Sequence, residues 1–405
     1  MSQVKVIQVK KHFYLVSLIQ FLIFIPFLLQ RFVGADWDSY ALVGTVINLY
    51  NDSIYLPSRP PGFPVYEYFL TILYSISNIF NINFEFLFLV NQFLFVLANN
   101  YLILLFFYRL TSKNFLLYYV ALLSPIYLIS GFSVIDYHAG LFFGLLGIYL
   151  VLYSPNLKFL IPLTFAISAG LRLSNVIFII AALLIVQRNS SDFKLVLRFL
   201  LTTGMFTIFI YLPGYISLWD TTLSLKLANP SDMFCVLNLT NTDHTFYGRI
   251  GRFILKQLDF FGMLGTLLVF GLFSKFRFEN INKNYYFFLI FILFEISFLR
   301  LPTERGHLLP AFISLVIILN SLDFKKITLL VIFISTFIGN FVYLSIYDVD
   351  QPDSATEIYF NLQIKPGLLI QDYEKRYEKG KDKDFYYDNS YYAIQNVWID
   401  GCPNK

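Results

Sequence analysis

Apolar segments long enough to span a membrane recur along nearly the whole chain, separated by short polar loops. They cover residues 13–33, 84–107, 115–132, 139–154, 157–187, 197–217, 253–273, 284–299, 308–322 and 327–347. A spanning helix needs about 17–25 apolar residues, whereas the strands of a membrane barrel alternate over about ten. Polar residues interrupt the run 157–187 around Arg172, and we interpret it as two short helices that meet there. The pattern predicts an all-α membrane protein, a bundle of about 11 transmembrane helices.

Lysine and arginine are distributed unevenly between the loops, and this asymmetry predicts the topology. Lys5, Lys10 and Lys11 precede the first segment, so we expect a cytoplasmic N-terminus. The basic loops between later segments then fall on the same side. We expect a multi-pass protein of the plasma membrane or ER, with a membrane domain over 1–347 and a small extracytoplasmic tail over 348–405. Its large outer loops are 34–83 and 218–252.

The composition supports a membrane protein and excludes some functions. Of the 405 residues, 57% are hydrophobic and only 14% are charged, against about 25% charged residues in globular proteins. The net charge of +4 is spread over the loops and forms no basic block, so nucleic acid is not expected as a partner. Cys235 and Cys402 both fall on the outer side, where a disulfide can persist.

The first outer loop contains two shorter helical patterns. Residues 39–51 place Tyr40, Val43 and Ile47 on a broad apolar face, which is typical of a helix lying in the membrane interface. Residues 65–80 are short and contain polar positions, and we interpret them as interfacial or re-entrant. Pro60, Pro61 and Pro64 separate the two patterns.

Two carboxylates, Asp36 and Asp38, stand where the chain first leaves the membrane. At this spacing they can share a divalent cation, or one can act as a general base that the other orients. The alternative is structural, because Asp38 or Ser39 could cap the helix over 39–51. Asp136, followed by His138, is predicted to face the same compartment; it could complete a metal site, bind an acceptor, or serve as an interfacial anchor.

Several arginines are predicted on or just under the outer face, against the usual trend. They are Arg59, Arg172, Arg300 and Arg305. The planar guanidinium group suits phosphate or pyrophosphate. Arg172 lies within an apolar run, where a charged side chain indicates function or a structural ion pair, with Glu295 or Asp136 as candidate partners. His307 could bind phosphate or cap the helix that follows it.

Familiar catalytic motifs are missing from the sequence. It contains no Walker A motif, no GxGxxG, no HExxH, no GxSxG and no cysteine pair at metal-binding spacing. It also shows no repeat of about 20–50 residues and no inverted halves, which disfavours a secondary transporter.

The first outer loop nevertheless resembles that of a known superfamily. Asp36-Trp37-Asp38-Ser39-Tyr40-Ala41 follows the first segment, and Arg59-Pro60-Pro61-Gly62-Phe63-Pro64 comes later in the loop. This arrangement is similar to the GT-C superfamily of polytopic glycosyltransferases, which use polyprenyl-phosphate-linked sugars. The similarity is closest to its protein-mannosyltransferase and aminoarabinose-transferase branch. In this family an acid is followed four residues later by Tyr and then by a small residue. Asp36, Tyr40 and Ala41 match this pattern.

Three later features extend the resemblance over residues 13–322. Asp136 matches an acid after the third helix, Ala169-Gly170-Leu171-Arg172 matches a basic helix break, and Glu304-Arg305-Gly306-His307-Leu308-Leu309-Pro310 matches a string that opens a helix. Two departures stand out. Trp37 replaces the usual second acid, which puts the metal requirement in doubt, and the large C-terminal domain of some members is reduced here to residues 348–405.

The resemblance implies transfer of a sugar, with inversion, from a polyprenyl- or dolichyl-phosphate donor to a glycan, lipid or protein acceptor on the extracytoplasmic face. In that scheme Asp36 is the catalytic carboxylate and deprotonates or orients the acceptor hydroxyl. Asp38 and Asp136 would bind a divalent cation, Mg or Mn, if there is one. The donor phosphate would be held by Arg59, Arg172, Arg305 and His307. The alternatives are a ligase or polymerase that moves a whole lipid-linked glycan, a lipid or polysaccharide transporter, and a structural assembly subunit.

Overall fold

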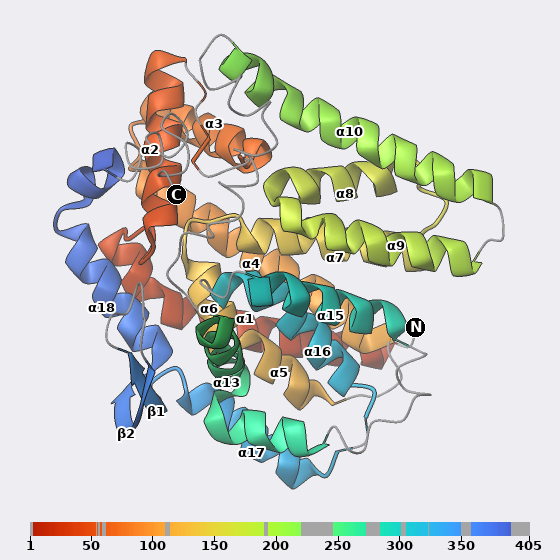
Figure 1. Ribbon diagram of the computed structural model, residues 1–405, viewed down its shortest axis with the longest axis vertical. Helices are drawn as coiled ribbons and strands as arrows, with labels where there is room; N and C mark the ends of the chain where they lie inside the picture. Colours follow the sequence, from red (N-terminus) through yellow and green to blue (C-terminus); the bar gives the residue numbers. More distant parts are fainter. Residues whose placement is uncertain are drawn as a thin grey trace. The chain divides into compact units, whose positions relative to one another are not determined.

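The computed structural model describes residues 3–53, 55, 57–58, 62–109, 114–189, 193–219, 246–272, 284–300, 305–322, 324–349 and 358–389. Over these ranges the protein is almost entirely helical, with one two-stranded sheet (Figure 1). Its contacts divide the chain into two interleaved units. The first comprises Met1–Pro26, Phe95–Gly131 and Asp243–Glu374, and the second Phe27–Leu94, Phe132–Thr242 and Lys375–Lys405.

The helices follow the apolar segments of the sequence closely. In the N-terminal half they are α1 (Gln3–Gln30), α2 (Trp37–Asp52), α3 (Pro64–Phe80), α4 (Phe84–Arg109), α5 (Phe115–Leu122), α6 (Pro125–Phe132), α7 (Tyr137–Tyr153), α8 (Leu160–Leu171), η1 (Leu173–Asn175) and α9 (Val176–Asn189). The remainder are α10 (Phe193–Trp219), α13 (Phe246–Leu272), α15 (Tyr285–Arg300), η3 (Arg305–Leu308), α16 (Leu309–Leu319), α17 (Lys326–Ile338) and α18 (Leu368–Gly380). Residues 383–389 are also helical.

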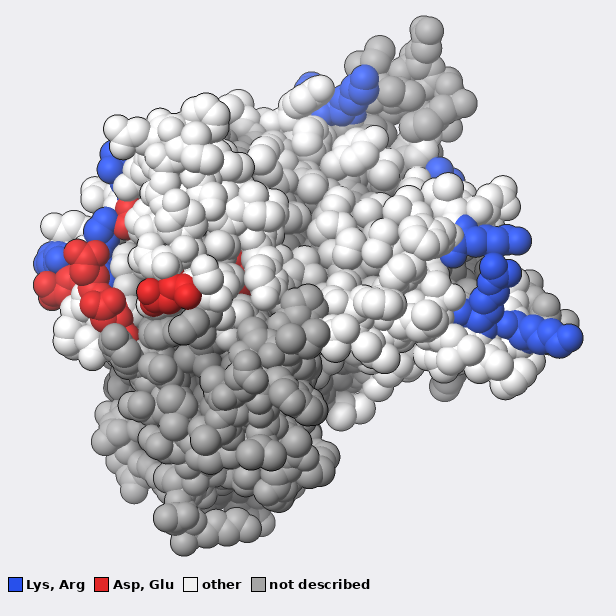
Figure 2. All heavy atoms as spheres, turned by 90° about the horizontal axis from the view of Figure 1, so that it is seen from above, with Lys and Arg blue, Asp and Glu red and all other residues white. Residues whose placement is uncertain are grey.

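Among the described residues, three helices are long and apolar enough to cross a membrane. They are Lys10–Gln30, Phe84–Arg109 and Phe193–Leu212, and the bent pair α5 and α6 makes a fourth if it forms one span. Seven further apolar helices have 10–17 residues. On the face drawn in Figure 2, most of the described surface carries no charged side chain. An all-α protein with membrane-spanning helices is therefore supported, whereas eleven crossings and the topology remain predictions.

The last predicted segment, 327–347, is wrong in its second half. The helix α17 ends at Ile338, and β1 (Val342–Val349) pairs antiparallel with β2 (Ile358–Pro366). Apolar and aromatic residues that continue a hydrophobic run suit a strand as well as a helix, so hydrophobicity alone does not distinguish them. We expected the membrane domain to end at residue 347. The strand pairing joins residues before this position to residues after it.

In the first unit, a sharp bend between α5 and α6 replaces the straight helix expected over 115–132. The two helices meet at 47°, because Pro125 has no N–H to continue the helical hydrogen bonds. The carbonyl groups freed by this break need partners in apolar surroundings. Gln20 Nε2 donates to the Leu122 carbonyl and Asn340 Nδ2 to the Leu123 carbonyl, both at 2.8 Å. Buried polar side chains thus make the bend possible.

In the second unit, helices α8 and α9 pack closely against α7. Gly140, Gly144 and Gly147 lie on one side of α7, and a Cβ at any of them would come within 2.4–2.6 Å of a side chain on α8 or the η1–α9 segment. Small residues allow helix backbones to approach this closely. The helix α8 also packs against α10.

The helix α2 differs from the interfacial helix expected over residues 39–51. Residues from Ser39 to Val46 of α2 are buried on every side of the helix, rather than on one apolar face. The segment expected over 65–80 is a regular 17-residue helix, α3, which packs against α2. The helix α2 therefore belongs to the core of the second unit. The helix α3 exposes Ile72, Ile79 and Phe80, and its interfacial or re-entrant placement stays a prediction.

Candidate functional site

Asp36 immediately precedes α2 and occupies its N-cap position. Its backbone is extended (φ −96°, ψ 149°), and its side chain makes no capping hydrogen bond. The structural alternative in which Asp38 or Ser39 caps this helix is therefore wrong. Asp38 lies in the first turn, where the helix dipole favours a negative charge.

The protein environment of Asp36 favours the protonated form of its carboxyl group more than bulk water would. Its side chain retains an exposed surface, but the dense protein around it limits its hydration. This desolvation raises the pKa of Asp36, and the neighbouring Asp38 carboxylate raises it further. Three positive charges on α18 oppose the rise, namely Arg376, Lys379 and Lys375. A carboxyl group with a raised pKa at a solvent-accessible position is suited to proton transfer.

The C-terminal helix α18 fixes the segment that carries Asp36. Lys379 Nζ donates a 2.7 Å hydrogen bond to the carbonyl of Ala35, the residue before Asp36. The fully buried Arg376 donates to the Phe132 carbonyl and to Ser133 Oγ, both at 2.6 Å. Hydrogen bonds to a charged group are worth about 1.5–3 kcal/mol each. The helix α18 thus holds both the segment before Asp36 and the segment before Asp136.

These two segments also bond directly to each other. The Val134 N–H donates a 2.6 Å hydrogen bond to the Val33 carbonyl. Val33 precedes Asp36 by three residues, and Val134 precedes Asp136 by two. The backbone therefore brings the two acidic segments together.

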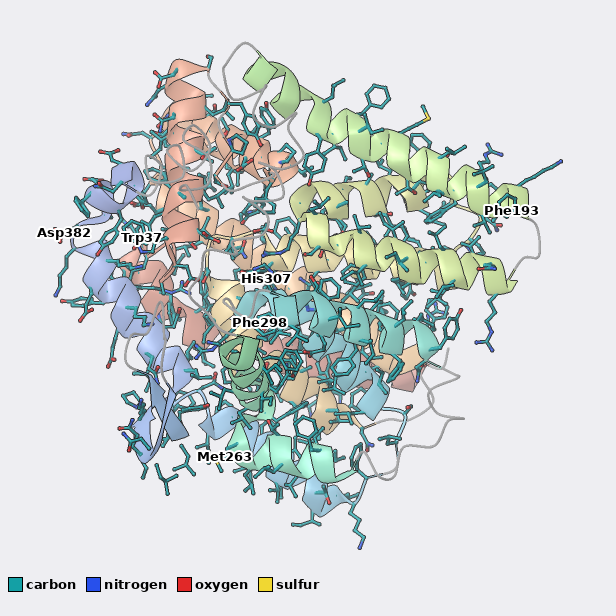
Figure 3. All side chains as sticks on the ribbon, viewed as in Figure 1. Trp37, Phe193, Met263, Phe298, His307 and Asp382 are labelled. Carbon is teal, nitrogen blue, oxygen red and sulfur yellow. The ribbon has the colours of Figure 1, made fainter. Side chains whose placement is uncertain are left out.

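Aromatic rings surround the Lys379 ammonium group. It lies 5.3 Å from the centroid of Trp37, 6.0 Å from that of Tyr40 and 5.5 Å from that of Tyr386. Trp37 lies at the start of α2 (Figure 3) and contacts Tyr386 edge to face. Cation–π contacts of this kind hold the lysine side chain in place, and they tie the residues after α18 to α2.

A buried carboxylate anchors the segment that follows α18. Glu85, in the first turn of α4, accepts hydrogen bonds from Lys383 Nζ at 2.6 Å and from the Tyr387 hydroxyl at 3.1 Å. Burial raises the pKa of Tyr387, and the nearby Glu85 charge raises it further, so the phenol stays protonated and donates to Glu85.

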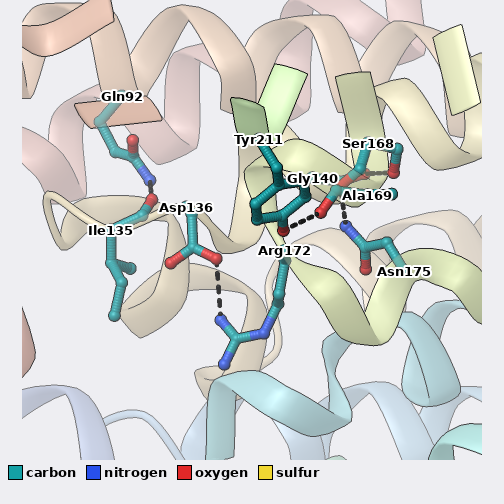
Figure 4. Close-up of polar contacts among 9 residues, drawn as sticks. All are labelled: Gln92, Ile135, Asp136, Gly140, Ser168, Ala169, Arg172, Asn175 and Tyr211. Atoms are coloured by element: carbon teal, nitrogen blue, oxygen red, sulfur yellow. Dashed lines mark hydrogen bonds and ion pairs between the residues drawn. The ribbon is translucent and has the colours of Figure 1, made fainter. Parts of the chain in front are cut away.

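Asp136 and Arg172 form a buried ion pair (Figure 4). Arg172 Nη1 lies 3.1 Å from Asp136 Oδ2, and the guanidinium carbon lies 4.1 Å from the centroid of Tyr137. The sequence left open an ion pair of Arg172 with either Asp136 or Glu295. Asp136 is the partner, and Glu295 instead accepts a hydrogen bond from Gln257 in the first unit. The phosphate-binding role of Arg172 stays a prediction.

Arg172 lies at the helix break that the sequence predicted. Its extended backbone (φ −160°, ψ 119°) joins α8 to η1. Carbonyl groups at the end of α8 receive side-chain donors, as Figure 4 shows: Tyr211 donates to Ala169 at 2.9 Å and Asn175 to Ser168 at 3.1 Å. On the other side of the pair, Gln92 Nε2 donates to the Ile135 carbonyl at 2.9 Å. The ion pair is therefore held at a fixed place.

Glu67 organises the loop between α2 and α3, and sequence reasoning missed it. This fully buried carboxylate accepts hydrogen bonds from the Ser58 N–H at 2.7 Å, from Ser58 Oγ at 2.6 Å, from the Phe63 N–H at 3.1 Å and from the Tyr55 hydroxyl. Burial raises the pKa of Glu67, while the hydrogen bonds oppose the rise. The sequence signal was that Glu67 is the single charged residue of this helix.

The other predicted site residues lie either outside the described residues or in the first unit, and their roles stay predictions. Arg59 and both cysteines, Cys235 and Cys402, lie outside the described residues, as does most of the second outer loop. Arg305 and His307 lie in η3, which belongs to the first unit. Within the described ranges, no three His, Cys, Asp or Glu side chains are grouped so that they could hold a metal ion.

Comparison of the chain with protein-family models, with characterised proteins and with solved structures finds no match.

Proposed function

We propose that this protein is a membrane glycosyltransferase that moves a sugar from a polyprenyl-phosphate donor to an acceptor on the extracytoplasmic face. One observation carries the proposal. Asp36 lies a few residues after the first candidate span, which ends at Gln30. It keeps an exposed surface and has a raised pKa because of desolvation and the neighbouring Asp38. A hydroxyl acceptor needs a base of this kind beside the membrane, because its own proton is held too tightly at neutral pH.

In the proposed reaction Asp36 accepts the proton of the acceptor hydroxyl as its oxygen attacks the anomeric carbon of the donor sugar. The new carbon–oxygen bond forms on the face opposite the phosphate, and the bond to the phosphate oxygen breaks. The polyprenyl phosphate leaves with the bonding electron pair. Positive side chains that neutralise this leaving group supply electrostatic stabilisation, and Arg59, Arg172, Arg305 and His307 are the candidates for that role.

The described carboxylates do not fit a divalent cation shared by Asp38 and Asp136. Asp136 is fully buried and its Oδ2 faces the Arg172 guanidinium, which competes with a cation for the same oxygen. No step of the proposed reaction therefore runs through a metal. Assays with added Mg²⁺, with added Mn²⁺ and with EDTA measure any dependence directly.

The test is sugar transfer from radiolabelled polyprenyl-phosphate monosaccharides by the purified protein in lipid bilayers. Asp36→Asn removes the base while keeping the size of the side chain, and Asp52→Asn is its matched control at the exposed far end of α2. We expect release of sugar by the wild type and by Asp52→Asn, and its loss in Asp36→Asn.

Two results would overturn the proposal. Full activity in a folded Asp36→Asn variant would show that Asp36 is not the base. A folded wild type that releases no sugar from any monosaccharide donor, but transfers a glycan from an oligosaccharide-pyrophosphate carrier, would establish the glycan-ligase alternative instead.

A further inference from the structure

One face of α17 is exposed along its whole length. Ile327, Leu330, Ile334, Ile338 and, just after the helix, Phe341 are between 41 and 63% exposed. Their spacing of three or four residues places them in a single row along the helix. The opposite face is buried against α13, where Leu329, Ile332 and Thr336 lie. The helix α17 therefore has a core-facing side and an apolar outward side.

The β-hairpin that follows the helix also exposes apolar side chains. Val342 and Leu344 on β1, and Leu362 and Ile364 on β2, are between 44 and 77% exposed. Leu344 is directly opposite Ile364 in the antiparallel register, and residues two apart on a strand point to the same side. These four residues, the hairpin stripe, thus share one face of the sheet.

The other face of the hairpin is turned toward the protein. Tyr343 and Ser345 alternate with the stripe residues on β1 and are 7 and 3% exposed. A strand that faces water usually exposes its polar side chains and buries its aliphatic ones, whereas this strand buries a serine and exposes aliphatic side chains. Neighbouring exposed apolar side chains mark a surface that a membrane or another protein covers.

The length of α17 indicates that a membrane covers this surface. Its 13 residues rise about 20 Å, which is short of the hydrocarbon core of a bilayer at about 30 Å. Exposed Lys325 and Lys326 stand at its N-terminal end, where a membrane boundary is expected. An apolar surface that extends beyond the C-terminal end of the helix supplies the missing length.

We propose that the hairpin stripe is a lipid-contacting surface that continues the outward row of α17 and inserts its side chains at the boundary between hydrocarbon and water. The hairpin backbone stays at this boundary, because the outer edges of a two-stranded sheet need water to satisfy their N–H and carbonyl groups. Side chains in such a position reach about 5–10 Å into the boundary layer. The proposal concerns membrane contact alone and is independent of the enzymatic function.

The test measures the collisions of spin labels with oxygen, which concentrates in lipid, and with a nickel chelate, which stays in water. Labels are attached to single cysteines at Leu344 or Ile364, in full-length protein with Cys235→Ser and Cys402→Ser, in phosphatidylcholine–phosphatidylglycerol vesicles. Ile334 on α17 is the lipid-side reference, and Glu374, an exposed charged residue of α18, is the water-side reference. Far-ultraviolet circular dichroism confirms that each variant is folded.

At Leu344 and Ile364 we expect oxygen collisions to dominate, as at Ile334, with nickel collisions at least several-fold below those at Glu374. Nickel collisions equal to those at Glu374 would show that water covers the stripe and would overturn the proposal. Low collisions with both reagents would also overturn it, because they would show that protein, such as a second copy of the chain, covers this surface.

Discussion

The loop between α2 and α3 allows a quantitative test of how the buried Glu67 carboxylate acts. Oε1 accepts from the N–H and hydroxyl of Ser58, and Oε2 accepts from the Phe63 N–H and the Tyr55 hydroxyl. In Glu67→Gln an NH₂ group replaces one of these oxygens. Whichever way the amide turns, its NH₂ group faces a backbone N–H, that of Ser58 or that of Phe63. The hydroxyl groups can rotate to accept, but the N–H cannot.

The expected cost follows from this one orphaned N–H. A buried donor without an acceptor costs about 1–3 kcal/mol, and the neutral amide is relieved of the charge-burial cost that Glu67 bears. This relief subtracts from the cost, so opening of the loop should become more favourable by at most about 3 kcal/mol, which corresponds to a change of up to roughly 150-fold in an equilibrium. Tyr55→Phe removes one donor but leaves no N–H facing a donor, so its effect should be smaller, about 1 kcal/mol.

Hydrogen–deuterium exchange with mass spectrometry, on peptides that contain Ser58 and Phe63, measures this directly. Exchange should accelerate in Glu67→Gln, less so in Tyr55→Phe, and not at all in Glu374→Gln, whose carboxyl is exposed on α18. If exchange of these peptides changes less than about twofold in Glu67→Gln, the carboxylate does not hold the loop. If Glu374→Gln gives the same acceleration, the effect is global and the reasoning also fails.

Two further predictions concern the proton affinity of Asp36 and the bend in α13. Because the pKa of Asp36 is raised, transfer should fall with decreasing pH before reaching the range of an ordinary aspartate, about 3.9. Transfer rates are measured over a pH series. Asp38→Asn removes a like charge and should move the fall in rate to lower pH, whereas Lys379→Met removes an opposite charge and should move it to higher pH. If both variants moved the fall in the same direction, the electrostatic account would be contradicted. Gly262 has φ 68° and ψ 166°, and a Cβ there would lie 2.9 Å from the Ser335 carbonyl oxygen, so Gly262→Ala should lower the free energy of unfolding by about 1–3 kcal/mol, measured by thermal unfolding in detergent. Gly204→Ala, whose Cβ meets nothing within 4 Å, should be neutral or slightly stabilising, and equal effects of the two changes would refute the argument.

Local features of the fold were predictable from the sequence. The helix expected over 84–107 is observed at Phe84–Arg109, and the break expected at Arg172 is present between α8 and η1. Both depend on signals within a few residues, namely an uninterrupted apolar run and a cluster of polar residues inside one. The helix–strand change after Ile338 was missed, because Val342–Val349 is apolar and aromatic in the same way as the helix before it.

The parts of the candidate site that depend on distant partners were not predictable. Asp36 and Asp136 stood out because carboxylates are rare among apolar segments, but nothing near Lys379 in sequence indicates that it bonds to Ala35. Glu67 was missed, since its donors lie on a loop whose path only the tertiary structure determines. The burial of α2 on all sides was likewise hidden, because it depends on how its neighbours are arranged.

The bond from Lys379 to Ala35 joins residues 344 positions apart, and this separation sets an order of events during synthesis. A ribosome adds about 5–20 residues per second, so the segment before Asp36 waits about 20–70 s after its own synthesis before Lys379 exists to hold it. During that interval the segment has neither Lys379 nor Arg376 as a partner. Any mRNA or nascent chain interrupted before codon 376 would yield a membrane-inserted protein whose acidic segments lack these two contacts. The site would then be completed by a helix made long after the one from which it emerges.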